Sequence, residues 1–247
     1  MPKEDPKDRL WLSIEKKRLS KQRWAATRIR RGLRESIRDT IYSLRQFGIA
    51  GVGDIELSQE PIEDAYKDIY EKVGVEFAQA SFRAFKSRKD ESAVNDYWVQ
   101  YMREFAVTES GERIKEVTKT TLSRIRRVIE QGVTEGAGID VIAREMERST
   151  AVSRARATTI ARTEIISASN RGSLLGMEST GVQMRKEWVS TRDARTRDDH
   201  VAVDGQLVEQ NEGFNVGGEE LKYPGDPMGS AGNVINCRCA VAGVPYE

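Results

Sequence analysis

Apolar residues recur at helical spacing through the first two thirds of the chain. The spacing of Ile37, Ile41 and Leu44 predicts one long helix over about residues 8–47, and Gly48 begins the glycine-rich stretch that ends it. The same spacing, interrupted by further glycines, predicts additional helices over about residues 61–80, 94–105, 114–129, 139–147 and 150–179.

The segment at residues 150–179 differs from the other predicted helices in its side chains. It is rich in Ala, Arg and Thr and carries few large apolar residues, among them Ile160, Ile165 and Leu174. Small side chains allow a helix to approach its neighbours closely. We therefore expect this helix to lie inside a helical cluster or along a partner.

The helical periodicity stops after Gly181, where Gly, Asp, Pro and Asn become frequent. Alternation predicts a strand at 184–189, a hairpin beginning within 201–208 with Asp204-Gly205 as its turn, and a last strand at 234–242. The expected fold is α+β, an elongated, mainly helical N-terminal body with a small loop-rich, β-containing C-terminal module. We divide the chain into a basic N-terminal helical region, a helical body and this module, at residues 1–56, 57–181 and 182–247.

Composition supports an elongated protein with much solvated surface, because 38% of the residues are apolar and 32% are charged. The net charge is only +1, but residues 1–50 hold 14 Lys and Arg against 6 Asp and Glu. Such a basic helix can contact DNA phosphates or a protein partner, or it can be a solvated face. The candidate contact residues are Lys16, Lys17, Arg18, Lys21, Arg23, Arg28, Arg30 and Arg31.

The chain shows no features of a secreted or membrane-spanning protein. The charged N-terminus lacks the apolar segment of a signal peptide, and no run approaches the ~20 apolar residues of a membrane span. Two cysteines do not make a disulfide scaffold. We therefore expect synthesis in a reducing cytoplasm.

The only histidine and the only two cysteines lie in the last quarter of the chain. His200, Cys237 and Cys239 are soft ligands suited to zinc, which takes four ligands, and a nearby Asp is a candidate for the fourth. The alternative is structural, with two small buried cysteines on an edge strand and a hydrogen-bonding histidine. Zinc is thus a possible cofactor, and no other cofactor is expected.

A second group of polar residues surrounds His200. Asp193 and Arg195 can lock a tight loop by bidentate hydrogen bonds, and an Asp beside His200 can also form an acid–base couple. No nucleophile elbow, zinc-protease motif or phosphate-binding loop accompanies them. We favour the structural role, and we expect Trp188 and Asp204 to belong to the same structural cluster.

Arg162 and Glu164 form a third group, with Asn170 further along the same predicted helix. Residues two apart do not face each other on a helix, so these two are not a simple intrahelical pair. Each can reach into the C-terminal module and tie it to the helix. The alternative is an ordinary solvated polar face.

The order of these residues resembles the phage Mu protein F-like family, the minor head or head morphogenesis proteins of tailed bacteriophages. The resemblance covers roughly the last 90 residues. Some relatives carry cysteines at the positions of Arg197 and His200, which together with a C-x-C pair looks like a zinc site; Arg197 departs from that version. The resemblance rests on Ala161-Arg162-Thr163-Glu164, Trp188, Asp193 to His200, Asp204-Gly205-Gln206, Tyr223 to Pro227 and Asn236 to Cys239.

The resemblance implies a virion protein of the phage head, near the portal, that is made in the bacterial cytoplasm. It implies the portal and major capsid proteins as partners, several copies per virion, and packaged double-stranded DNA as a possible contact. It implies no catalytic residues. The alternative is an enzyme, a metal-dependent nuclease or transferase that uses Arg162, Glu164 and His200.

Overall fold

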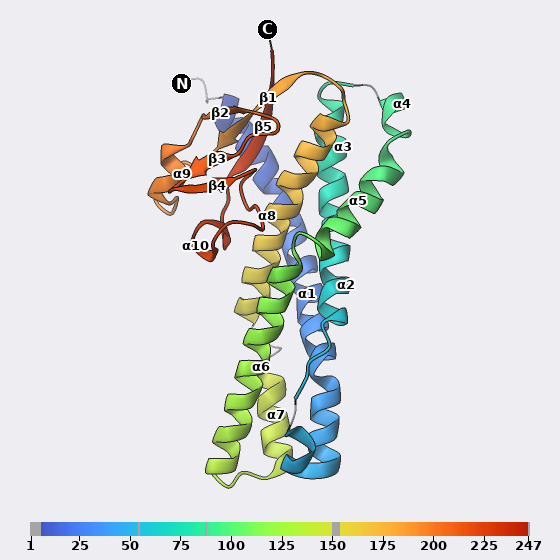
Figure 1. Ribbon diagram of the computed structural model, residues 1–247, viewed down its shortest axis with the longest axis vertical. Coiled ribbons are helices and arrows are strands. Elements are labelled where there is room, and N and C mark those ends of the chain that lie inside the picture. Colours follow the sequence, from blue (N-terminus) through green and yellow to red (C-terminus); the bar gives the residue numbers. More distant parts are fainter. Residues whose placement is uncertain (1–5, 54, 87, 150–153, 247) are drawn as a thin grey trace.

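The computed structural model describes residues 6–53, 55–86, 88–149 and 154–246. Long helices form an elongated body, and a small module of strands and short helices lies beside one end of it (Figure 1). The α+β fold class expected from the sequence is confirmed. The helical elements of the body are α1 (Pro6–Phe47), η1 (Gly48–Val52), α2 (Glu60–Ile69), η2 (Tyr70–Gly74), α3 (Val75–Arg83), α4 (Arg88–Glu91), α5 (Asn95–Val107), α6 (Gly111–Thr134), α7 (Ile139–Ser149) and α8 (Arg154–Glu178).

Helix α1 runs along the body and presents one apolar face to it. Ile29, Leu33 and Ile37 are each 1% exposed, and Leu44 is fully buried. Their spacing is the one that predicted the helix. At the end of the body far from the module, α6 and α7 form a hairpin that packs beside the end of α1 (Figure 1).

Helix α8 packs very closely on η2 and α3, which continue α2 through a π-helical turn. A Cβ atom added at Gly172 would lie 2.1 Å from the carbonyl oxygen of Gly74, and one at Gly176 would lie 2.1 Å from that of Ala78. Only glycine fits at such distances. The expectation that small residues place this helix inside a helical cluster is confirmed.

The module contains a three-stranded antiparallel sheet in the order β2-β1-β5 and a separate hairpin, β3-β4. The first sheet pairs Trp188 with Val241 and Glu187 with Leu207. The elements of the module are β1 (Met184–Val189), α9 (Asp198–Ala202), β2 (Leu207–Glu209), β3 (Phe214–Val216), β4 (Glu219–Leu221), α10 (Ala231–Val234) and β5 (Ala240–Pro245).

Two sequence predictions for the module need correction, whereas the strand at 184–189 is confirmed. Residues 198–202 form the helical turn α9, which two acidic residues in its first turn favour, so the chain is not extended before Asp204. The last strand begins at Ala240 rather than at 234, because Asn236 has a positive φ of 56° and turns the chain. Both cysteines therefore lie in an irregular segment before β5 and not on a strand.

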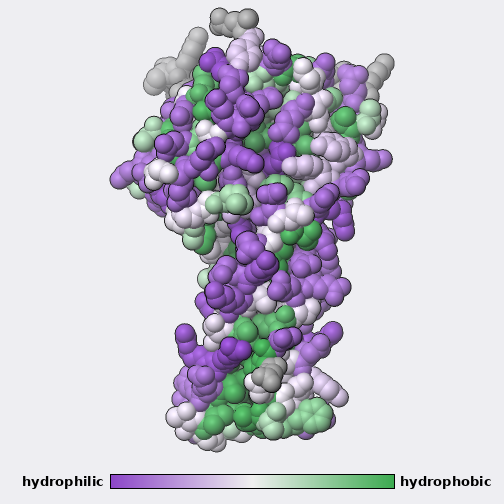
Figure 2. Space-filling model, in the orientation of Figure 1, coloured by the Kyte–Doolittle hydropathy of each residue, from purple (hydrophilic) through white to green (hydrophobic). Residues whose placement is uncertain are grey.

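The end of the body opposite the module carries exposed apolar side chains. Figure 2 shows a hydrophobic area over this end of the molecule. Phe47 is 68% exposed, and Val133 and Val141 are about half exposed. No helix within the described ranges is long and apolar enough to cross a membrane.

Candidate functional site

Asn170 lies where α8, α1 and the C-terminal module meet. Its Nδ2 donates to the carbonyl oxygens of Pro224, at 2.6 Å, and Cys239, at 3.1 Å. Its Oδ1 accepts from Nη2 of Arg18, at 2.8 Å, and from the backbone N–H of Val241, at 3.1 Å. These four bonds use the full capacity of the amide, so the side chain is held in one orientation.

Arg18 crosses from α1 into the same interface and is only 3% exposed. Its Nε donates to Oγ of Ser169 at 2.8 Å, and its Nη1 donates to the carbonyl oxygens of Arg238 and Cys239, each at 3.2 Å. Burial lowers the pKa of Arg18 to about 10, which leaves it charged at neutral pH. The prediction that Arg18 contacts DNA or a partner is corrected, because its side chain is buried and bonded to acceptors inside the protein.

Glu164 is 2% exposed and belongs to a second buried polar group. Its Oε2 accepts from the hydroxyl of Tyr70 at 2.9 Å and from Nη1 of Arg113 at 3.2 Å. Arg113 also donates through Nη2 to the carbonyl oxygen of Gly225 in the module, at 2.9 Å. Burial, reinforced by Glu164, raises the pKa of Tyr70, so its hydroxyl stays a donor. Glu164 is therefore tied to the module through Arg113.

Arg162 points elsewhere and is exposed. With the amide of Gln22 oriented so that its oxygen faces α8, that oxygen accepts from Nε of Arg162 at 2.8 Å and from Nη2 at 3.2 Å. Among the described residues, no hydrogen bond or ion pair joins any two of Arg162, Glu164 and His200. The three side chains of the enzyme hypothesis are thus held in different surroundings.

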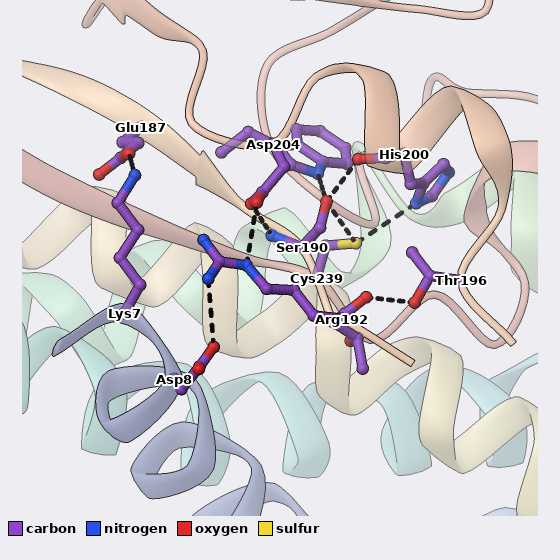
Figure 3. Close-up of polar contacts among 11 residues, drawn as sticks. Lys7, Asp8, Glu187, Ser190, Arg192, Thr196, His200, Asp204 and Cys239 are labelled. Carbon is purple, nitrogen blue, oxygen red and sulfur yellow. Dashed lines mark hydrogen bonds and ion pairs between the residues drawn. The ribbon is translucent and has the colours of Figure 1, made fainter. Parts of the chain in front are cut away.

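His200, Cys237 and Cys239 do come together, inside the module. Nδ1 of His200 lies 3.4 Å from Sγ of Cys239 and 3.7 Å from Sγ of Cys237, and all three side chains are buried. The ring of Trp188 packs edge-on against His200, with centroids 5.5 Å apart. Ser190 bridges the group: its hydroxyl donates to the carbonyl oxygen of His200 and lies 3.8 Å from Sγ of Cys239 (Figure 3).

The two thiols of this cluster differ in acidity. A hydrogen bond from Cys237, reinforced by His200, lowers the pKa of Cys239. The same hydrogen bond to Cys239, together with burial, raises the pKa of Cys237. The arrangement thus favours a negative sulfur on Cys239 that its neighbours stabilise.

The spacing of the cluster matches three corners of a zinc site. Tetrahedral zinc with bonds of about 2.3 Å to sulfur and about 2.0 Å to nitrogen places its ligand atoms roughly 3.5 Å apart. The three ligand atoms of His200, Cys237 and Cys239 all lie within 4.8 Å of one another. Nε2 of His200 is buried without a hydrogen-bond partner in the described part of the chain. No fourth His, Cys, Asp or Glu from the described segments joins the group.

Asp193 pairs with Arg238, a partner that the sequence did not indicate. Two hydrogen bonds join the side chains, at 2.5 and 2.6 Å. Nη2 of Arg195 lies 3.8 Å from the same carboxylate, which also accepts from the backbone N–H of Arg195 at 3.0 Å. These bonds from Arg238 lower the pKa of Asp193. Asp204 accepts from the backbone N–H of Ser190 at 2.8 Å and so fixes the end of β1. The loop after β1 is therefore held by hydrogen bonds at Ser190, where it begins, and at Asp193.

The N-terminal basic run is divided between ion pairs and solvent. Lys21 pairs with Glu76 at 2.6 Å, and Arg28 forms an ion pair with Asp68. Arg30 is half-buried on the same helix. The side chains of the run that reach solvent are Lys16, Lys17, Arg23 and Arg31, and the last of these also pairs with Glu35 at 2.8 Å.

Several residues of the interface lacked a clear signal in the sequence. Arg113 and Tyr70 lie on helices whose apolar faces alone marked them as core helices. Lys186 is 1% exposed, donates to the carbonyl oxygen of Lys222 at 2.8 Å and lies 5.4 Å from the centre of the Phe214 ring. The alternation of β1 placed Lys186 on the same side as Trp188, which was the one available hint that it is buried.

The second half of the chain is similar to proteins of a known family. Residues 123–242 match the family described as Phage Mu protein F like protein. The chain is 32% identical over 123 residues to the minor head protein GP7 of Bacillus phage SPP1, which covers 49% of this chain and 40% of that protein. It is 24% identical over 139 residues to an uncharacterized Bacillus subtilis protein, YqbB, which covers 54% of this chain and 46% of that protein.

A third relative carries the name of an enzyme. The chain is 34% identical over 111 residues to the NAD(+)--arginine ADP-ribosyltransferase EFV of Enterococcus faecalis, which covers 44% of this chain but only 23% of that protein. The chain thus spans less than half the length of each of these three relatives. No solved structure matches it. The segment that matches the phage Mu protein F-like family, residues 123–242, contains α8, the His200 cluster and the loop after β1.

Proposed function

We propose that this protein is a minor head protein of a tailed bacteriophage that acts in head morphogenesis and not as an enzyme. The observation that carries the proposal is the family match over residues 123–242, together with the similarity to a phage minor head protein. A virion location, near the portal and inside or on the head, follows from the same proposal.

The buried interface supports a structural role. Asn170 and Glu164 are buried and form hydrogen bonds with partners inside the protein, so neither presents a reactive group to solvent. The relative with an enzyme name matches over only 23% of its own length. We therefore propose that this chain shares with it a structural segment, and that Arg162, Glu164 and His200 perform no nuclease or transferase chemistry.

We propose that the end of the body opposite the module docks on the portal or major capsid protein. Exposed apolar side chains there, including Phe47, Val133 and Val141, form the kind of surface that protein partners cover. The exposed cations Lys16 and Arg23 lie on α1 in its first half and are the proposed contacts with packaged DNA.

Head association is tested by expressing the protein with its portal and capsid partners in the host and sedimenting the assembled heads. The expected result is co-sedimentation in several copies per head, reduced by a Phe47→Asp/Val141→Asp variant at the docking end. A matched Tyr97→Asp variant, altered at an exposed aromatic on α5, should still co-sediment. A protein recovered only from the soluble fraction would contradict the proposal.

We further propose that His200, Cys237 and Cys239 hold a zinc ion. The donor set is soft, the three ligand atoms converge within 4.8 Å, and water can supply the fourth ligand. Such an ion would link α9 to the segment before β5 and so stabilise the module. Zinc would also be compatible with the absence of a cysteine at Arg197, because three protein ligands already converge.

A further inference from the structure

A cavity of about 790 Å³ lies at the seam between α1, α8 and the module. Six cationic side chains and two carboxylates line it, a formal charge of +4. Volumes of this order are typical of sites for small molecules. The seam therefore holds a basic cavity large enough for a ligand of nucleotide size.

The two carboxylates do not neutralise this cavity. Asp193 is engaged by the bidentate bonds from Arg238, and one oxygen of Glu15 is buried without a hydrogen-bond partner among the described residues. Arg18 is satisfied by internal acceptors. Asp193, Arg238 and Arg18 are therefore held in place by internal bonds, and the remaining positive charge of the cavity comes from other side chains.

Lys16 and three guanidinium groups supply that remaining charge. Arg162 comes from α8, whereas Arg195 and Arg197 come from the loop after β1. In the described part of the chain neither Arg162 nor Arg197 forms a salt bridge. The guanidinium of Arg195 has one long contact, 3.8 Å, to the carboxylate of Asp193, which is already paired with Arg238. Like charges that line one cavity repel each other unless an anion lies among them.

Apart from Lys16, Gln22 and Asn236, the remainder of the lining is apolar and suits the other parts of a nucleotide. Ile165 and Ile166, both nearly buried, line the cavity, and Leu12 and Leu19, each about half exposed, contribute from α1. Trp11 is held at the wall by a hydrogen bond from its Nε1 to the carbonyl oxygen of Arg238, at 3.1 Å. Guanidinium groups bind phosphate oxygens through paired N–H donors, and a base or sugar can lie against apolar side chains.

We infer that this cavity binds a phosphate-bearing ligand of nucleotide size, through Arg162, Arg195 and Arg197. The source of the phosphate is either a free nucleotide or the phosphorylated end of a DNA strand. This inference goes beyond the proposed head role and does not depend on it, since head association and ligand binding are measured separately. It also differs from DNA contact along α1, because two of the three walls come from α8 and the module.

The test is isothermal titration of the full-length protein at physiological ionic strength with ADP, and with a short DNA duplex with or without terminal 5′-phosphates. The test variant is Arg162→Ala/Arg195→Ala, because both side chains are exposed and neither supports the buried network. The matched control is Arg126→Ala/Arg127→Ala, which removes two exposed arginines from α6. Far-UV circular dichroism and thermal melting should be unchanged in both variants.

Binding of ADP that the test variant weakens about tenfold or more, and the control does not, supports the inference and identifies a free nucleotide. Binding only of the phosphorylated duplex, with the same dependence, supports it and identifies a strand end. Failure of both ligands to bind overturns it, as does binding that is insensitive to the test variant. Binding of a glutamate-rich peptide but of neither phosphate ligand also overturns it, and would assign the cavity to an acidic protein segment.

Discussion

Replacing Asn170 with alanine should loosen the C-terminal module from the helical body. The substitution removes four hydrogen bonds from a buried site. The carbonyl oxygen of Cys239 keeps a bond from Arg18, but Nη2 of Arg18, the carbonyl of Pro224 and the N–H of Val241 lose the amide. Each buried polar group left without a partner costs about 1–3 kcal/mol, so three such groups predict a loss of about 3–9 kcal/mol.

A loss of this size is a large share of the ~5–15 kcal/mol that stabilises a typical domain. Urea denaturation followed by tryptophan fluorescence and by circular dichroism measures it. Limited proteolysis should show earlier cleavage within residues 182–247. Asn95→Ala is the matched control, because the amide of Asn95 makes one half-buried bond, to Gln79 at 3.0 Å, and its loss should cost about 1 kcal/mol or less.

A decrease below about 1 kcal/mol for Asn170→Ala would refute the reasoning, since three unsatisfied buried groups should not be that inexpensive. The same conclusion would follow if Asn170→Ala and Asn95→Ala lowered the free energy of unfolding equally. In either case the apolar contacts between α8 and the module, and not the amide, would hold the interface.

Three further predictions concern other buried groups. Glu164→Gln should lower the free energy of unfolding by about 3 kcal/mol, because it leaves a buried arginine unpaired, and a denaturation midpoint like that of the wild type would contradict this. Burial lowers the pKa of Lys186 from 10.5 to about 8, so between these two pH values the unfolded chain binds more protons than the folded one. The free energy of unfolding should therefore rise with pH through that window, by at most about 3 kcal/mol. Denaturation at pH 8 and at pH 10 measures this rise, which should be absent in Lys186→Met. Elemental analysis should find about one zinc per chain, lost in a Cys237→Ser/Cys239→Ser variant, and metal-free wild-type protein with an unchanged melting temperature would exclude a structural zinc at His200.

Helical periodicity was sufficient to predict the body, because long amphipathic helices repeat one simple pattern. The face of α1 and the small residues of α8 are where the sequence placed them. The module was harder, because its turns depend on single residues. The positive φ of Asn236 shifts the last strand, and the acidic turn at Asp198 replaces an extended segment.

The sequence predicted which residues belong to the candidate site, but not which of them form hydrogen bonds or ion pairs with one another. The sequence grouped His200 with Cys237 and Cys239, and the structure brings these side chains together. It could not show that Asp193 pairs with Arg238, or that Arg18 is buried, because both depend on contacts between distant segments. A basic residue in a basic run is expected at the surface, because the sequence does not show that distant carbonyl groups accept its hydrogen bonds.

The family match and the buried interface together define a unit larger than the module. The matched segment, residues 123–242, holds both sides of the contact between Asn170 and the module, and it holds the Glu164 carboxylate. Arg18 and Arg113, which complete the two polar groups, lie outside it. Buried polar groups are nearly always paired, and in this chain Asn170 and Glu164 each receive one of their donors from a helix that the family match does not cover. The orientation of the module on the body is therefore set jointly by the matched segment and by the helices that precede it.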